Sequence, residues 1–306
     1  MNNITFKLFV KTIISFLIIS FAVDKLIYLS ISQMDKKVLS GVKVGKVNHY
    51  LSIKDTTGLI VYGSSRATRH LNTSKMNGFN IGMDKKKIAF SATLIKLLPK
   101  NHKQTVVLHL DTDNFFNENY DGSDIKSLSN LIYRNEIVNK EFKKLNQNDL
   151  ITNFYYTILY NNKLLPILKN YFFPKYDPKN YDGFFPVKTT SLQKKIFKII
   201  LNKKTSKPCP KNYKTNTIHN NYINEIISFC KENNKKLIVF TSPLYDDNCK
   251  EDNFLFTKIM NDKNIDYYDF TDFFNNNNDI KYWHDLGHLS NIGAEKFTNE
   301  FIKILN

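Results

Sequence analysis

Short apolar runs alternate with segments of helical periodicity through two long stretches of this chain. The runs lie at 59–62, 78–82, 104–111, 235–243 and 264–270. Apolar residues also recur every three or four positions at 84–99, 217–233 and 291–304. Strands that alternate with helices form parallel sheets covered on both faces. We therefore expect an α/β fold of three layers, with about five parallel strands between the helices.

The alternation stops between residues 113 and 216, where tyrosine and phenylalanine are frequent. A segment of this length after the third strand would overhang the carboxyl edge of the sheet, where open α/β sheets bind ligands. We expect a mostly helical insertion at 113–216, which forms either a lid or substrate platform or a second packing layer. The α/β core then consists of residues 56–112 and 217–306.

The N-terminus holds an uncharged run, 12–23, between Lys11 and Asp24. A transmembrane helix needs about 20 residues, so this run alone is too short to cross a bilayer. The span lengthens if Lys11 reaches outward and Asp24 lies at the far interface.

We therefore predict that residues 1–31 form a single-pass anchor in the cytoplasmic membrane. A polar connector at 32–55 would follow, with the rest of the chain on the extracytoplasmic side. Two alternatives stay open. The segment could be a signal peptide, with Ser20 and Ala22 as the small residues before the cut, or a buried helix of a soluble protein.

The net charge of +16 comes almost wholly from lysine, because only three of the 44 basic residues are arginines. Proteins that read nucleic acids usually carry arginine on a recognisable motif, and the sequence holds no such motif. We interpret the charge mainly as solvated surface, with attraction to anionic lipid or acidic glycan as the alternative. Nucleic acid is not an expected partner.

The three cysteines, Cys209, Cys230 and Cys249, lack the spacing of metal ligands. The sequence also holds no glycine-rich phosphate loop. We expect neither a metal site nor a cofactor. A bridge between Cys209 and Cys249 is one pairing that the sequence allows.

Two short motifs stand near the two ends of the α/β core. Gly63-Ser64-Ser65 follows the first strand directly, and Asp285 precedes His288 by three positions just before the last helix. A serine hydroxyl there would lie at the carboxyl edge of the sheet, and a histidine acting as a base needs a carboxylate on its other nitrogen. The simpler interpretation is that the serines cap a helix and the aspartate caps a turn.

Together the motifs resemble those of the SGNH (GDSL-type) hydrolase superfamily. "YGSSR" is similar to the family's Gly-Asp-Ser, and "DLGH" to its Asp-x-x-His. The wording "GSSRA" and "HLSNIGAEKF" looks more like the exported, membrane-anchored branch, which includes D-alanyl-lipoteichoic acid biosynthesis protein D and relatives of the alginate acetyltransferases. The resemblance implies a flavodoxin-like fold, with Ser65 as nucleophile, His288 as base and Asp285 orienting it. It also implies an oxyanion hole made by the amides of Ser65 and Gly82.

One family block is absent. The third strand ends in "LHLDTDNFF", with Asp111 and Asp113 where the family has the glycine and asparagine of Gly-x-Asn-Asp. An ionised carboxylate cannot donate to an oxyanion. Either the hole has fewer donors, or Asn114 or Arg66 supplies one, or the chain has lost catalysis.

Arg66, Asp113 and Asn114 are our candidates for substrate binding. Arg66 stands in the first turn of a helix, where a cation is unfavourable. We expect it to contact an anionic part of the substrate. The alternative is that it pairs with Asp111 or Asp113 across the sheet edge.

By this resemblance we expect a membrane-anchored serine esterase or O-acyltransferase. Its substrate would be an acylated cell-surface polysaccharide or glycolipid, and partner proteins of the cell envelope would be consistent with that role. The alternative is a catalytically inactive protein that keeps the SGNH scaffold for glycan binding or assembly.

Overall fold

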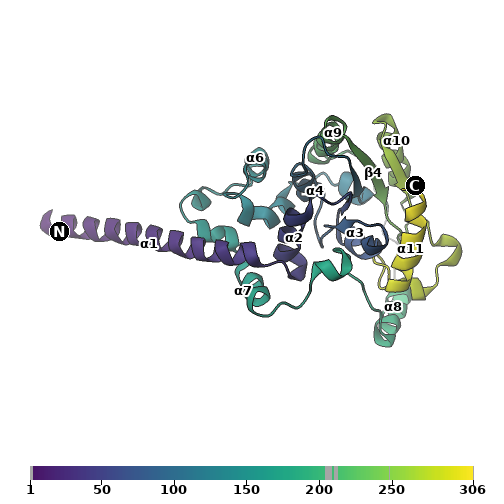
Figure 1. Cartoon of the computed structure of the whole chain (residues 1–306), viewed down its shortest axis with the longest axis horizontal. Coiled ribbons are helices and arrows are strands. Elements are labelled where there is room, and N and C mark those ends of the chain that lie inside the picture. Colours follow the sequence, from purple (N-terminus) through teal and green to yellow (C-terminus); the bar gives the residue numbers. More distant parts are fainter. Residues whose placement is uncertain (1–2, 204–208, 210–212, 248, 306) are drawn as a thin grey trace. The chain divides into compact units, whose positions relative to one another are not determined.

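The computed structural model describes residues 3–203, 209, 213–247 and 249–305 (Figure 1). The chain divides into two compact units. The first, here called the helical unit, combines Met1–Asn48 with Lys126–Tyr176. The second, the sheet unit, combines His49–Ile125 with Asp177–Asn306. Along the chain, α2 (Lys46–Ile53) leads from one unit into the other.

The sheet unit contains a five-stranded, entirely parallel sheet with the order β2-β1-β3-β4-β5. Its strands are β1 (Leu59–Tyr62), β2 (Phe79–Asn80), β3 (Gln104–His109), β4 (Lys235–Thr241) and β5 (Asp266–Asp269). Each falls within a run that the sequence marked as a strand. The predicted α/β class with about five parallel strands is therefore confirmed.

Helices cover both faces of this sheet. On one face, Val61, Val107 and Phe240 belong to the same buried cluster as Phe297 and Phe301. The helices of this face are α3 (Ser65–His70) and α11 (Asn291–Lys303). The alternate residues face the other way, as the pleat requires.

On the opposite face, the Tyr62 hydroxyl lies 3.1 Å from the Tyr50 hydroxyl, which donates to the Leu94 carbonyl. The helices of this face are α4 (Ile88–Ile95) and α9 (Thr217–Glu232). The sheet unit also contains α5 (Thr112–Phe115), α8 (Ser191–Lys203) and α10 (Lys250–Asp262).

Helix α4 begins four residues later than its apolar pattern suggests. Lys85 has a positive φ of 61°, which interrupts a helix that would start at Asp84. The Asp124 carboxylate then accepts the N–H groups of Lys87 (2.8 Å) and Phe90 (3.2 Å). A distant side chain therefore caps this helix in place of a local one.

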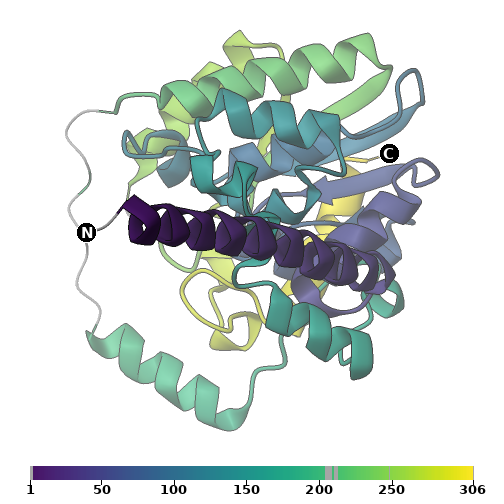
Figure 2. The ribbon, with the colours of Figure 1, turned by 90° about the vertical axis from the view of Figure 1, so that its left-hand side faces the viewer.

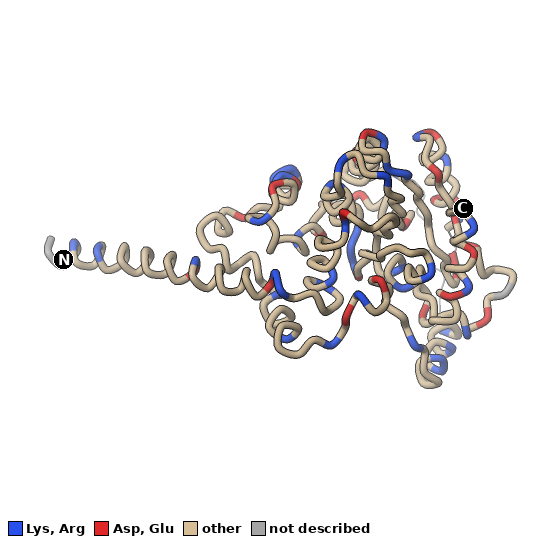
Figure 3. The backbone as a smooth tube through the Cα atoms, viewed as in Figure 1, with Lys and Arg blue, Asp and Glu red and all other residues tan. Residues whose placement is uncertain are grey.

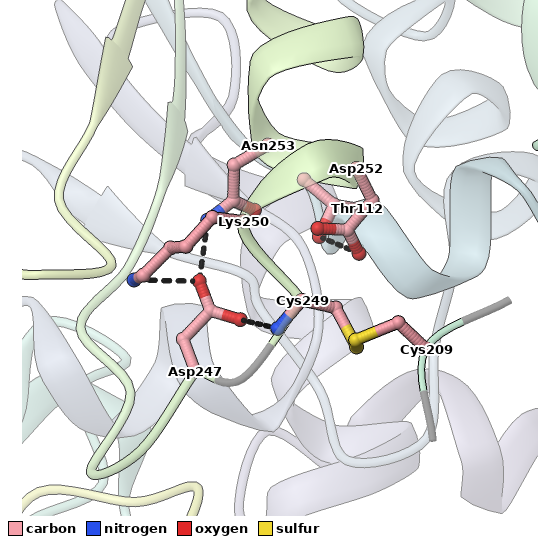
Figure 4. The surroundings of a disulfide bond; sticks show 7 residues. All are labelled: Thr112, Cys209, Asp247, Cys249, Lys250, Asp252 and Asn253. Carbon is pink, nitrogen blue, oxygen red and sulfur yellow. Dashed lines mark hydrogen bonds and ion pairs between the residues drawn. A yellow bond between two sulfur atoms is a disulfide. The ribbon is translucent and has the colours of Figure 1, made fainter. Parts of the chain in front are cut away.

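A disulfide joins Cys209 to Cys249, next to the start of α10 (Figure 4). The Asp247 carboxylate accepts the N–H of Cys249 and a hydrogen bond from Lys250 on the same turn. Cys230 is a free, buried thiol, and burial raises its pKa to about 12. The pairing that the sequence allowed is thus the one observed.

The helical unit is built around α1 (Asn3–Lys37), the purple helix drawn along its length in Figure 2, together with other helices of this unit. These are α6 (Glu136–Lys144), α7 (Leu164–Phe172), η1 (Gly41–Gly45), η4 (Leu150–Asn153) and η5 (Tyr156–Tyr160). In the second half of α1, the buried residues Asp24, Tyr28, Ile31 and Asp35 recur every three or four positions. That spacing places them on one helix face.

Asp35 is a fully buried carboxylate at the end of this face. It accepts hydrogen bonds from Asn130 (2.8 Å), Arg134 (2.6 Å) and Asn48 (3.1 Å). These partners come from both chain segments of the helical unit. The second half of α1 is therefore part of a folded core.

Three predicted boundaries differ from those of the elements and units in the structure. The first helix does not end at residue 31, because its buried face continues to Asp35. The expected connector at 32–55 is the end of α1 followed by η1 and α2. The expected insertion at 113–216 belongs to two units, since only Lys126–Tyr176 joins the helical unit.

The first half of α1 has a different character from the second. Its apolar side chains are exposed, and Figure 3 shows a long uncharged stretch along it. Residues Thr5–Lys37 are long and apolar enough to cross a membrane, and their most apolar window is not buried. A signal sequence shares this length and composition.

Two truncations should separate the apolar half of α1 from the packed half. Removing residues 2–22 keeps Asp24, Tyr28 and Ile31, so we expect a protein that is soluble without detergent and has an unchanged melting temperature. Removing residues 2–31 deletes those buried side chains and should cost on the order of 3–5 kcal/mol of stability. Thermal denaturation measures both. Equal melting temperatures would show that the second half of α1 contributes nothing to the fold.

Candidate active site

Ser65 is placed by a sharp turn at the end of β1. Gly63 has φ +138°, and a Cβ there would lie 2.7 Å from the Cβ of His109, so only glycine fits. Ser64 is the N-cap of α3, and its hydroxyl accepts the N–H of Arg66 at 3.3 Å. Ser65 is the first residue of α3, so its own N–H has no carbonyl acceptor within the helix. This N–H lies on the same residue as the hydroxyl and is not used in the hydrogen bonds of the helix.

His288 lies within hydrogen-bonding distance of Ser65. The distance from His288 Nε2 to Ser65 Oγ is 2.8 Å, and His288 Nδ1 lies 2.9 Å from both carboxylate oxygens of Asp285. With Nδ1–H donating to the carboxylate, Nε2 is left to accept the serine proton. The predicted convergence of these three side chains is confirmed.

The Asp285 carboxylate is fixed by its own loop. Its Oδ1 accepts the N–H groups of Gly287 (2.8 Å) and His288 (2.9 Å). Burial alone would raise the pKa of Asp285, but the hydrogen bonds and the charge of His288 hold it below its ordinary value. The carboxylate is therefore ionised at neutral pH and orients the imidazole.

His70 contacts the loop that carries Asp285 and His288. The sequence analysis did not identify His70 as part of the site. Its Nε2 accepts the N–H of Leu289 at 3.1 Å, and its ring packs edge-on against His288. Burial, and after it the charge of His288, lowers the pKa of His70 well below its ordinary value. The neutral ring thus keeps an acceptor nitrogen for Leu289. A single bond to a backbone group 219 positions away leaves no pattern in a sequence.

Arg66 pairs with Asp111 at the end of β3. We expected Arg66 to bind substrate; the structure shows the ion pair that was the alternative, and Arg66 also lines the cavity next to Ser65. Burial alone would raise the pKa of Asp111, but Arg66 and, after it, His109 hold it below its ordinary value. Burial lowers the pKa of His109 to about 4, and its Nε2 lies 3.1 Å from the Ser242 hydroxyl. The pair joins the first turn of α3 to the residues that follow β3.

The Arg66–Asp111 pair gives a stability prediction. Arg66→Ala should cost about 3 kcal/mol, because it leaves the largely buried Asp111 carboxylate without its cationic partner. In a double-mutant cycle with Asp111→Ala, the double variant should lose less than the sum of the two single losses. Chemical denaturation measures each term. Losses that simply add would show that the two side chains are not coupled.

This contribution should also depend on pH. The pKa of Asp111 in the folded chain lies below its ordinary value of 3.8. The stability from the pair is therefore complete above that value and is lost as the pH falls through the lower, folded pKa. At neutral pH the wild-type chain should exceed Asp111→Ala in stability, and the difference should shrink under strong acid.

Ser65 and His288 open onto a cavity of about 280 Å³. Its lining includes three consecutive lysines, Lys85, Lys86 and Lys87. The cavity lies where the ends of β1 and β3 meet, at the point where the strand order reverses in the sheet. Open α/β sheets bind their ligands at such a point. The lysine lining would favour a substrate that carries negative charge.

The N–H of Gly82, which the resemblance implied as the second oxyanion donor, is already hydrogen-bonded in the structure. This N–H donates to the Asn80 side chain at 2.9 Å, and a Cβ on Gly82 would meet the backbone N of Thr68 at 2.9 Å. The residue is enclosed and does not line the cavity. The Asn80 side chain thus accepts the hydrogen bond from the N–H that the resemblance assigned to the oxyanion hole.

The other two candidates for substrate binding differ from each other. Asp113 does not line the cavity. Burial, and after it the charge of Asp113, raises the pKa of Asp252 in α10 to about 6. Asn114 does line the cavity, and its Nδ2 lies 3.2 Å from Asp111. Its amide has a second N–H. Asn114 is therefore the better side-chain candidate for an oxyanion donor.

No protein-family model matches this chain, and no curated protein matches it. Among the described residues, no three His, Cys, Asp or Glu side chains are grouped to hold a metal ion. The assignment of function therefore depends on the geometry around Ser65.

Proposed function

We propose that this chain is a membrane-anchored serine esterase or O-acyltransferase with an SGNH-like fold. The observation that carries the proposal is the continuous hydrogen-bond chain from Ser65 through His288 to Asp285. The strand order β2-β1-β3-β4-β5 supports it, because this is the order of flavodoxin-like sheets.

The reaction would begin with attack of Ser65 Oγ on the carbonyl carbon of an ester. His288 Nε2 takes the serine proton, and Asp285 stabilises the resulting imidazolium. The oxyanion would accept the N–H of Ser65 and an N–H of Asn114. His288 then gives its proton to the departing alcohol, which leaves an acyl group on Ser65. Water or a sugar hydroxyl, deprotonated by His288, releases that acyl group.

The proposed substrate is an acylated polysaccharide or glycolipid of the cell envelope. The apolar half of α1 supports a location at the membrane. The Cys209–Cys249 disulfide supports an extracytoplasmic sheet unit, because disulfides persist in oxidising compartments.

The second candidate is a non-catalytic scaffold that binds or assembles glycans. It is favoured by the engagement of the Gly82 N–H, which leaves the site without one donor of the family. Removal of one oxyanion donor typically lowers the rate by about 10²–10³-fold. A weak oxyanion hole would suit a chain that no longer turns over esters.

Release of nitrophenol from p-nitrophenyl acetate by the full chain in detergent separates the two candidates. The matched control is His288→Ala, because it keeps every lysine that could react with the ester non-catalytically. We expect release that depends on His288. Acetyl transfer to an added oligosaccharide would identify a transferase, and acetate alone a hydrolase. Equal release by the two proteins would favour the scaffold.

A further inference from the structure

Three large apolar side chains are exposed next to one another in and just after η4. Leu150 is 80% exposed, Ile151 60% and Phe154 61%. We call these three residues the η4 surface. Contiguous apolar surface of this kind on a folded unit usually marks a place of contact with a partner or a membrane.

The segment that follows the η4 surface is hydrogen-bonded to α1 at Asp24 and Lys25. The Asp24 carboxylate accepts the N–H groups of Tyr156 (2.7 Å) and Thr157 (3.1 Å). The next residue of α1, Lys25, donates to the Phe154 carbonyl. Asp24 is itself buried, so these bonds are shielded from water. The segment that carries the η4 surface is thus held beside α1 at Asp24.

That level is where α1 would leave a bilayer. A helix rises about 1.5 Å per residue, so about 20 residues cross a hydrocarbon core of about 30 Å. Counted from Thr5, where the apolar span begins, this length ends at Asp24. The side chains of Lys25 and Tyr156 meet there, with the ammonium 3.3 Å from the ring centroid. Lysine and tyrosine are the residues that typically lie at a membrane–water interface.

We propose that the η4 surface inserts into the interfacial layer of the bilayer beside α1, as a second membrane contact of the helical unit. The inference rests on the proposed anchoring by α1. Lipid is the occupant we assign, because exposed apolar side chains of α1 reach this level and continue past it at Leu26, Ile27 and Leu29. A single spanning helix leaves a folded unit free to tilt. A second contact fixed through Asp24 restrains that tilt.

Depth-dependent fluorescence quenching tests this contact in the full chain. The protein is reconstituted into nanodiscs of phosphatidylcholine and phosphatidylglycerol, and a dye is attached through Phe154→Cys. The matched control is Phe172→Cys, because Phe172 is 60% exposed and ends α7. Its neighbour Asn170 accepts from Ser40, beyond the end of α1. That end lies 13 residues past Asp24, or about 20 Å along the helix axis. Phe16→Cys in the apolar half of α1 serves as the marker of insertion.

We expect nitroxide-labelled lipid to quench the dyes at positions 16 and 154, and aqueous iodide to quench only the dye at 172. The unsubstituted chain measures labelling of the native cysteines. Quenching at 16 combined with iodide access at 154 would overturn the η4 contact and leave the anchor intact. Shielding of 154 from both quenchers would mean a protein partner, which also overturns it. If lipid nitroxide did not quench the dye at position 16, both the anchoring by α1 and the η4 contact would be contradicted. Ester turnover of each variant shows separately whether the proposed catalysis holds.

Discussion

Ser65→Ala is expected to lower ester turnover by about 10⁴-fold or more while leaving the melting temperature unchanged. The Ser65 hydroxyl is the group that His288 contacts at 2.8 Å, and its loss removes the nucleophile itself. Alanine keeps the backbone N–H and the start of α3. Turnover of p-nitrophenyl acetate and thermal denaturation, measured on the same preparation, give both quantities.

Ser64→Ala is the matched control, because the two serines are adjacent and differ in their partners. The Ser64 hydroxyl accepts the N–H of Arg66 and lies 3.4 Å from His109 Nδ1. Its removal should cost about 1 kcal/mol of stability, as for other lost caps, with a much smaller effect on turnover. If Ser64→Ala abolished turnover and Ser65→Ala did not, the pairing with His288 would be wrong.

Asp285→Asn should lower kcat by about 10³–10⁴-fold without unfolding the loop. Asparagine keeps an oxygen for the N–H groups of Gly287 and His288, so the loop retains its bonds. With that oxygen held by the loop, the amide NH2 group faces Nδ1 and donates to it, so the imidazole loses both its tautomer and its counter-charge. Steady-state kinetics and the melting temperature measure the two effects separately.

The loss in Asp285→Asn should persist across the mildly acidic range. Because the pKa of Asp285 lies below 3.8, the wild-type carboxylate remains ionised whenever the pH exceeds that value. Wild-type activity should therefore exceed that of the variant at every pH between mildly acidic and neutral. A ratio that collapsed to one already in mild acid would contradict the ionised state of Asp285.

The strands and the convergent side chains could be predicted because local patterns determine them. The apolar run at β1 matches the observed strand, Leu59–Tyr62, residue for residue. Parallel strands end at one edge, so a serine after β1 and a histidine before α11 meet there once the sheet forms. The two motifs were therefore enough to predict that Ser65, Asp285 and His288 lie close together.

The failures come from contacts made across long distances in the sequence. Asp24 was interpreted only as the interfacial end of a membrane segment, but it also accepts N–H groups more than 130 positions away. Gly82 was assigned to the oxyanion hole by analogy, and the Asn80 side chain that occupies its N–H carries no pattern. Hydrogen bonds of this kind, from backbone N–H groups to side chains, depend on the tertiary structure. The periodicity of apolar residues in the sequence does not predict them.

The most direct test of the central claim is to map a fluorophosphonate adduct by tandem mass spectrometry. The full chain in detergent is labelled, digested and compared with the His288→Ala variant. An activated serine should react, so we predict one adduct on Ser65 that is absent from the variant. An adduct on Ser64 or on another serine, or an unlabelled wild-type chain, would contradict the assignment of Ser65 as the nucleophile.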